Sequence, residues 1–407
     1  MSSLTRLKLS SGADRAMFIV ALGIMAAVSP MATDIYLASI PAAAEYFRTP
    51  ITAVQLSLST YMIGMALGQL VLGPVSDRLG RYGLIVAGTS VFTLSSAGIA
   101  LSTSIEMMLV LRAVQGIAGA AGVVVGRAMV SDTVSGIEAA KVYTLLGTIT
   151  SMAPIVAPLI GGVIASQAVW QTVFWLLTGF GLLMLTGTLV VLKETLPPAE
   201  RSRAGLVGIF EGPWRMLGQP VFMGWALALA FAFGCLFSYI SASSFVLQNI
   251  VGLSELGYSL VFALGALCGL LGGLVNVRLL NRFSPGAILR TALIALSCIN
   301  LVGLAALLAG APMWTLIAHV VAAQACFGFV MGNAIALGQA EARHRAGAGS
   351  AVLGLLQFLL GGIASPLSGL GGDSTAVPMA VWMLIFSGLA LTCAVTALRL
   401  SRRADAD

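Results

Sequence analysis

Long apolar runs separated by short polar segments dominate the chain. A window of about 20 residues, the length that an α-helix needs to cross the hydrocarbon core of a membrane, finds twelve such runs. The fifth and sixth are separated by only a few residues. The runs lie near 16–40, 53–75, 83–103, 107–129, 141–166, 169–192, 218–243, 255–279, 286–310, 313–338, 347–370 and 376–399. The pattern predicts an all-α membrane protein with twelve spanning helices.

Composition agrees with a membrane protein and excludes several other classes. Hydrophobic residues make up 58% of the 407 residues and charged residues 9%, whereas soluble domains carry about 25% charged residues. The first run is too long for a cleavable signal peptide. The five cysteines lack CxxC spacing and the two histidines lie far apart, so we expect neither a metal site nor a disulfide framework. No cofactor is expected.

The placement of basic residues predicts the orientation of the chain. Lys and Arg concentrate at both ends and in every second loop, whereas the alternate loops contain only Arg48. Cytoplasmic loops are enriched in Lys and Arg, so we expect both termini in the cytoplasm. The same distribution accounts for the net charge of +6, and a nucleic-acid partner is not expected.

The longest basic loop divides the chain into two halves of six helices. We expect an N-terminal bundle over 1–192, a cytoplasmic linker over 193–217 and a C-terminal bundle over 218–407. The linker contains Pro197-Pro198 and mixed charge, which is typical of a solvated connection.

A weak internal repeat relates the two halves. Asp77-Arg78-Leu79-Gly80-Arg81 follows the second run, and Val277-Arg278-Leu279-Leu280-Asn281-Arg282 follows the eighth. Arg112 and His319 enter the fourth and tenth runs at similar depth. Transporters built from two six-helix repeats hold their substrate between the halves, near the membrane midplane.

Several segments resemble the major facilitator superfamily. Gly73-Pro74-Val75-Ser76-Asp77-Arg78-Leu79-Gly80-Arg81-Tyr82 matches its signature loop between helices 2 and 3. Leu111-Arg112-Ala113-Val114-Gln115-Gly116 resembles the helix 4 motif that carries a buried arginine, and Ala157-Pro158-Leu159-Ile160-Gly161-Gly162 resembles the helix 5 motif of proton-coupled exporters.

Three further segments resemble one branch, the Bcr/CflA drug-resistance transporters. They are Thr33-Asp34-Ile35-Tyr36-Leu37, Ala346-Gly347-Ala348-Gly349-Ser350-Ala351 and, more loosely, Gly126-Arg127-Ala128-Met129-Val130-Ser131-Asp132, in which Ser131 stands where the family often has a base. The resemblance implies two pseudo-symmetric six-helix bundles in a bacterial inner membrane. It also implies a drug/proton antiporter that exports small antibiotics such as chloramphenicol or bicyclomycin.

Two charged residues inside apolar runs are candidates for proton coupling. Asp34 lies deep in the first run, just after Ser29-Pro30, and an acid at membrane depth usually lines a water-filled pathway or a proton relay. Arg112 cannot shed its proton and must find acceptors in the bundle, for which Asp34 is the natural candidate, directly or through water. The alternatives are an acid at a helix end near the headgroups, and an arginine that extends to the outer headgroups.

Charges at cytoplasmic helix ends are candidates for gating. Asp77, Arg81 and Arg127 lie there, and the N-terminus of the eleventh helix, near Gly347, should attract an acid. In the family, the acid that matches Asp77 helps to hold the cytoplasmic side closed. The alternative is a solvated charge.

Pro158, Gly161 and Gly162 are further gating candidates, in the fifth run. Proline removes a backbone donor, and glycines let a neighbouring helix approach closely. A bendable helix that seals against leakage is one interpretation of this pattern, and ordinary helix packing is the other.

The candidates for substrate binding are polar or aromatic residues within apolar runs, as ligand pockets require. They are Tyr36, Tyr61, Tyr239, His319 and Gln357. For His319 the alternative is a buried packing histidine with satisfied hydrogen bonds.

Two functions remain open from the residues. The first is proton-coupled efflux of small amphipathic drugs by a monomer in the lipid bilayer, and the second is a carrier for one dedicated metabolite, such as a sugar or nucleoside. Few amide or charged side chains lie deep in the runs, which disfavours a highly hydroxylated substrate. No metal cluster, nucleophile elbow or catalytic carboxylate pair is evident, so an enzyme is not expected. The lack of a phosphate-binding loop disfavours an ATP-driven pump.

Overall fold

The computed structural model describes residues 12–134, 136–201, 206–342 and 346–404, and in these residues the regular elements are all helical. Twelve helices are long and apolar enough to cross a membrane. This confirms the predicted fold class, including the separation of the fifth and sixth spans, which only residues 168–170 divide.

The first half contains six spans, of which the first is broken into several pieces. Those pieces are α1 (Gly12–Ala26), α2 (Val28–Asp34), the 3₁₀ turn η1 (Leu37–Ser39) and α3 (Ile40–Phe47). The other five spans are continuous and comprise α4 (Ile51–Leu79), α5 (Arg81–Ala100), α6 (Ile105–Thr133), α7 (Gly136–Gln167) and α8 (Gln171–Val191).

The predicted linker segment contains secondary structure of its own. It contains the 3₁₀ turn η2 (Pro198–Glu200) and the helix α9 (Leu206–Leu217). The second half then comprises α10 (Pro220–Phe245) with its π-helical extension η3 (Val246–Ile250), α11 (Glu255–Leu279), α12 (Pro285–Leu308), α13 (Trp314–Glu341), α14 (Ala346–Ser368), the 3₁₀ turn η5 (Gly372–Ser374) and α15 (Val377–Ala404).

Serine caps begin several of the spans where the sequence turns from polar to apolar. The hydroxyl groups of Ser104, Ser254 and Ser284 each accept a hydrogen bond from the main-chain N–H three residues further on, at 3.3, 3.1 and 3.3 Å. Such a bond satisfies one of the free donors at a helix N-terminus, so these three starts are encoded locally.

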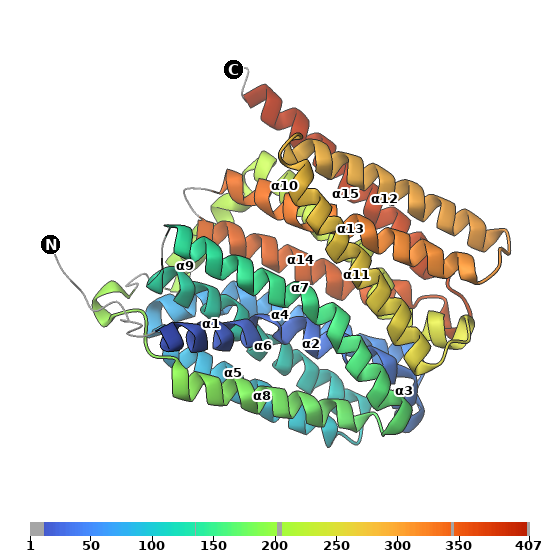
Figure 1. The fold of residues 1–407 in the computed structure, drawn as a ribbon, viewed down its shortest axis with the longest axis horizontal. Coiled ribbons are helices and arrows are strands. Elements are labelled where there is room, and N and C mark those ends of the chain that lie inside the picture. Colours follow the sequence, from blue (N-terminus) through green and yellow to red (C-terminus); the bar gives the residue numbers. More distant parts are fainter. Residues whose placement is uncertain (1–11, 135, 202–205, 343–345, 405–407) are drawn as a thin grey trace.

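The helices form two groups that lie side by side (Figure 1). The blue-to-green helices of the first half lie below the yellow-to-red helices of the second, and α4 packs along α14 and α7 along α11 between them. We call the end of the bundle where α1 begins and α15 ends the terminal face, and the other end the opposite face. At the opposite face η1 and α3 contact helices of the second half.

Candidate functional site

The first span is interrupted at Asp34. Pro30 and Pro41 each remove a main-chain donor, and a proline ring also disfavours the preceding helical turn. Asp34 is the last residue of α2 and is buried. It lies close to the middle of the 32-residue span Ala16–Phe47. Asp34 therefore lies inside the helical bundle and not at an end of its span.

Residues of both halves lie near the Asp34 carboxyl group. Thr33 Oγ1 lies 2.8 Å from Asp34 Oδ1, and the same hydroxyl lies 3.0 Å from the Ser29 carbonyl oxygen. One hydroxyl proton can serve only one acceptor at a time. The carboxyl group also interacts electrostatically with Tyr61 of the first half and Tyr239 of the second. Asp34 is therefore at the boundary across which the two halves would move.

Arg112 is fully buried and its acceptors come from three helices. Its Nη1 donates to the carbonyl oxygen of Ala32 at 3.0 Å and to Gln115 Oε1 at 2.7 Å. Its Nε donates to the carbonyl oxygen of Ser57 at 3.3 Å. Arg112 has no exposed surface, which excludes a side chain extended to the outer headgroups.

Aromatic rings surround the Arg112 guanidinium. Its central carbon lies 4.6 Å from the ring centroid of Tyr61, 5.6 Å from that of Tyr36 and 5.7 Å from that of Phe174. A cation over an aromatic face is attracted by the ring quadrupole, by about 2 kcal/mol or more when desolvated. These rings stabilise a charge that has no carboxylate partner.

The expected direct pairing of Arg112 with Asp34 is not present, since no ion pair joins these two residues in the described structure. Arg112 instead bonds the main chain at Ala32, two residues before Asp34. In an intact helix, main-chain carbonyl oxygens accept hydrogen bonds from N–H groups one turn further on. Where a helix is interrupted, some of these oxygens lack that donor, and a guanidinium can donate to them with no carboxylate involved. Arg112 therefore bonds the main chain of the interrupted helix that carries Asp34, without a direct ion pair to the Asp34 carboxyl group.

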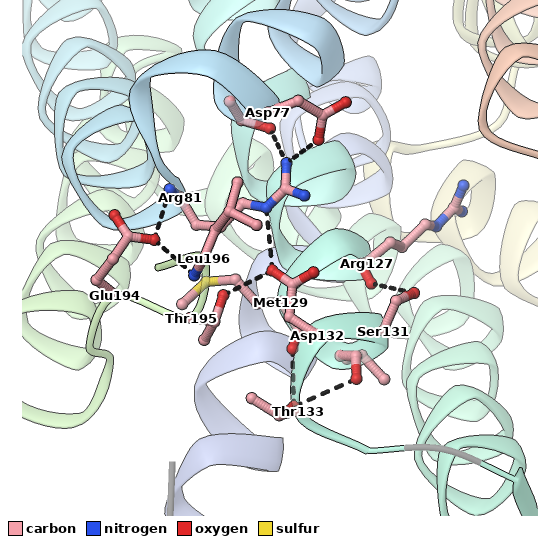
Figure 2. Close-up of polar contacts among 12 residues, drawn as sticks. Asp77, Arg81, Arg127, Met129, Ser131, Asp132, Thr133, Glu194, Thr195 and Leu196 are labelled. Carbon is pink, nitrogen blue, oxygen red and sulfur yellow. Dashed lines mark hydrogen bonds and ion pairs between the residues drawn. The ribbon is translucent and has the colours of Figure 1, made fainter. Parts of the chain in front are cut away.

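A second cluster of charges lies at the terminal face and centres on Arg81 (Figure 2). Arg81 Nη1 donates to Asp77 Oδ1 and to Ser76 Oγ, and its Nε donates to Asp132 Oδ2 at 3.1 Å. The hydroxyl of Thr195 donates to the same oxygen at 2.8 Å. Arg81 thus connects α4, α6 and the start of the linker.

Glu194 completes this cluster by capping α5. Its Oε1 accepts from the Arg81 N–H at 2.9 Å and from the Leu196 N–H at 3.0 Å, and its Oε2 accepts from the Tyr82 N–H at 3.4 Å. Gly80, which precedes α5, has φ +103° and offers no capping side chain. A carboxylate at a helix N-terminus also interacts favourably with the helix dipole.

The surroundings of Glu194 lower the pKa of its carboxyl group. Partial burial raises this pKa, but three main-chain hydrogen bonds and the nearby charge of Arg201 lower it more, so that it lies below its ordinary value. Sequence reasoning did not identify Glu194. The one available signal, an acid just after the sixth apolar run, does not reveal a partner 113 residues away.

The structure does not show the expected contact between Asp77 and α14. Asp77 pairs with Arg81, four residues along the same chain segment, and its side chain is 53% exposed. Arg127 does not pair with Asp77 either, and its side chain points away from the Arg81 cluster (Figure 2). Of the charged gating candidates, the structure brings together Asp77 and Arg81 only.

Gly161 and Gly162 lie where α7 contacts the first span of its own half and α11 of the other half. A β-carbon on Gly161 would collide with the carbonyl oxygen of Ile35, and one on Gly162 would collide with Ser259 Oγ and approach the carbonyl oxygen of Glu255. Pro158 lies within α7, one turn before them. The glycines therefore allow α7 to touch the helix 1 break on one side and α11 on the other.

The five candidate substrate residues have different surroundings in the described structure. Tyr36 and Tyr61 pack against Arg112, and Tyr239 stacks on Phe262 with ring centroids 5.7 Å apart. Gln357 is half-buried on α14. A cavity of about 620 Å³ opens at the opposite face beside Glu45, Arg48 and Glu255, and none of the five lines it.

His319 belongs to a buried hydrogen-bonded cluster inside the second half. Asn300 Nδ2 donates to the carbonyl oxygen of Met383 at 3.1 Å and to Ser387 Oγ at 3.1 Å, and Asn300 Oδ1 lies 3.0 Å from His319 Nε2. Because the carbonyl fixes the orientation of the amide, His319 Nε2 carries the proton. The cluster joins α12, α13 and α15, while His319 Nδ1 is buried without a hydrogen-bond partner among the described residues. His319 therefore packs within the bundle with one ring nitrogen hydrogen-bonded, but its hydrogen bonds are not all satisfied.

These features define a membrane transporter with two helical halves and a buried polar site at their boundary. The family model of the Major Facilitator Superfamily matches residues 22–366. The chain therefore belongs to the major facilitator superfamily.

Similar proteins narrow the assignment within this family. The chain is 35% identical to the "Uncharacterized MFS-type transporter YdgK" of Bacillus subtilis, over 92% of the chain and 94% of that protein. It is 28% identical to the "Bicyclomycin resistance protein homolog" of Haemophilus influenzae, over 89% of the chain and 91% of that protein. It is 29% identical to the "Chloramphenicol resistance protein" of Pseudomonas aeruginosa, over 89% of the chain and 86% of that protein. These relatives support the predicted resemblance to Bcr/CflA-type drug transporters.

Among solved structures, the chain is similar to the crystal structure of a D-xylose-proton symporter. The TM-score is 0.74 at 13% identity, over 94% of this chain and 97% of that one. At this identity the similarity concerns the fold alone.

Proposed function

We propose that the protein exports small amphipathic drugs of the chloramphenicol or bicyclomycin type in exchange for protons. The carrying observation is Asp34, a buried acid at a helix break on the boundary between the halves. The names of two relatives support the substrate class. A carrier for a single sugar or nucleoside remains the alternative.

The coupling follows from what a buried carboxylate tolerates. An ionised acid without a cationic partner is costly in a dry environment, whereas its neutral form is tolerated. Because Arg112 bonds main-chain carbonyls and not Asp34, a charged Asp34 favours a conformation in which water reaches it. A protonated Asp34 favours the packed arrangement seen here. Proton binding and release at Asp34 would thereby shift the balance between two conformations of the halves.

We further propose that the terminal face lies in the cytoplasm of a bacterial cell and that a monomer transports. A cysteine introduced at Ser401, near the end of α15, should resist an impermeant thiol reagent in intact cells. One at Thr103, in an exposed loop of the opposite face, should react. The reverse labelling pattern would contradict the proposed orientation. An obligate dimer in detergent would contradict the proposal that a monomer transports.

Asp77 is proposed to act when the terminal face closes. Its half-exposed carboxylate would then meet the N-terminus of α14, where helix dipoles favour an acid by about 0.3–1 kcal/mol. Asp77→Asn should therefore lower transport while drug binding survives. If cysteines at the terminal face were equally accessible in the variant and the parent, this role would be wrong.

Proteoliposomes test the proposed function directly. With an imposed pH gradient, labelled chloramphenicol should accumulate in the more acidic compartment, since drug moves against the proton flow. A protonophore should abolish this accumulation. Labelled xylose and uridine serve as matched cargo controls. Accumulation of either, with none of chloramphenicol, would favour the single-metabolite carrier.

A further inference from the structure

The two halves meet at the opposite face through segments that depart from α-helical geometry. In the first half this segment is the 3₁₀ turn η1, and in the second half it is the π-helical turn η3. The η1 turn contacts both α10 and α11. Short 3₁₀ and π segments within helices frequently mark hinges and functional sites, so this contact is more than packing between straight helices.

Two glutamine amides cross the boundary at this point, in opposite directions. Gln55 of α4 donates through Nε2 to the carbonyl oxygen of Ser241 in α10, at 2.9 Å. Gln248 of η3 donates through Nε2 to the carbonyl oxygen of Ala38 in η1, at 3.3 Å. Each half therefore supplies one amide donor and one main-chain acceptor.

Additional polar contacts support each glutamine. The hydroxyl of Ser365 in α14 donates to the main-chain carbonyl oxygen of Gln55 at 3.2 Å, and Gln248 Nε2 also donates to Ser244 Oγ at 3.0 Å. Gln55 is 1% exposed. Its Oε1 atom is buried without a hydrogen-bond partner among the described residues, so its side chain contributes to this contact through the Nε2 donor. A buried N–H donor that loses its acceptor is left unsatisfied, so the bonds from Gln55 and Gln248 favour the closed arrangement of the two halves.

We propose that Gln55 and Gln248 form the gate of the opposite face. Their reciprocal bonds keep the halves together at this end, break when the halves separate, and set how often this end opens. Both groups are neutral amides, so the gate itself does not titrate. The pH would change how often the gate opens through the protonation of Asp34, which lies four residues before the acceptor residue Ala38. The place of the gate in a transport cycle rests on the proposed function, but its opening does not.

Accessibility from the opposite face tests the gate without drug or proton gradient. The reporter is Ser59→Cys, one turn deeper than Gln55 on α4 and buried, in a chain whose native cysteines are replaced. In intact cells an impermeant maleimide should label the reporter slowly. Gln55→Leu and Gln248→Leu should each raise the labelling rate by about two- to tenfold, the effect of one ordinary hydrogen bond, and the double variant should raise it further.

Matched variants separate the gate from general loosening. Gln324→Leu removes a buried amide that packs against α11 within the second half, and it should leave the labelling rate unchanged. Gln55→Asn and Gln248→Asn keep the amide but shorten its reach, and they should behave like the leucine variants if either of those fails to fold.

A disulfide provides an independent measurement of the same gate. A β-carbon on Gly362 of α14 would lie 3.5 Å from Met62 Cβ of α4 across the boundary, a separation that suits a disulfide, so the pair Met62→Cys and Gly362→Cys should cross-link readily on oxidation. The glutamine variants should slow this cross-linking severalfold. If the glutamine variants label and cross-link at the same rates as Gln324→Leu, the proposed gate is wrong. If their rates change as expected but the parent protein does not export the drug, only the proposed substrate or coupling is wrong.

Discussion

Gly161 of α7 lies so close to Ile35 that a β-carbon on this glycine would collide with the Ile35 carbonyl oxygen. Ile35 directly follows Asp34, so the helix 5 motif touches the main chain of the proposed proton site. The neighbouring Gly162 has the same relation to Ser259 of the second half. One short segment of α7 thus contacts both the main chain next to Asp34 and the partner half.

Gly161→Ala should therefore impair transport. The added methyl group has no room beside Ile35, and overpacking of this kind costs about 1–3 kcal/mol. We expect a lower melting temperature and a loss of coupled efflux. Gly147→Ala in the same helix is the control, because nothing lies within 4 Å of the added atom. That variant should be neutral or slightly stabilising, and equal effects of the two substitutions would refute the close contact.

Asp34→Asn should abolish proton-coupled export while drug binding survives. Asparagine keeps the size of the side chain but cannot exchange a proton. Drug addition to wild-type proteoliposomes should change the pH of a weakly buffered medium, and the variant should show no change. Glu106→Gln, at the exposed start of α6, should retain both signals. Active efflux by Asp34→Asn would show that the coupling residue lies elsewhere.

Arg112→Lys should fail despite its retained charge. Lysine offers a point charge where the guanidinium reaches Ala32, Ser57 and Gln115 together. Each buried acceptor left without a donor costs roughly 1–3 kcal/mol, so thermal stability and transport should both fall. Arg290→Lys, on an exposed position of α12, should change neither. A fully active Arg112→Lys would mean that charge alone matters at this position.

Glu194→Gln should loosen the linker in a pH-dependent manner. Because the pKa of Glu194 is lowered in the folded protein, its stabilisation is present above the ordinary glutamate pKa of about 4.3. It is lost as the pH falls through the lowered value. Cleavage by trypsin after Arg201 at pH 7 should therefore be faster in the variant. The difference in thermal stability between wild type and variant should shrink below about pH 4.

The control for this prediction is Glu200→Gln, an exposed acid in η2 of the same linker. It should be cleaved at the wild-type rate. If trypsin cleaved both variants equally faster than the wild type, the loss of any negative charge would loosen the linker. The loss of the cap on α5 would then not be the cause.

Much of the architecture could be predicted from the sequence by itself. Twelve spans follow from local hydropathy, because a helix in lipid satisfies its own main-chain hydrogen bonds and needs only about 20 apolar residues. The depth of Asp34 and the burial of Arg112 follow from the same reasoning, since charged groups in a span must face the protein interior.

The hydrogen-bond partners of side chains on other helices could not be predicted from the sequence, and only the tertiary structure determined them. Arg112 bonds the Ala32 carbonyl oxygen where residue types suggested Asp34. Glu194 caps a helix that begins at Arg81, and Gln55 and Gln248 reach across to the other half. In each case the acceptor or donor is a main-chain group, which every residue carries and no side-chain pattern reveals. Which main-chain groups become available depends on where helices break and how closely they pack, and these are properties of the whole bundle.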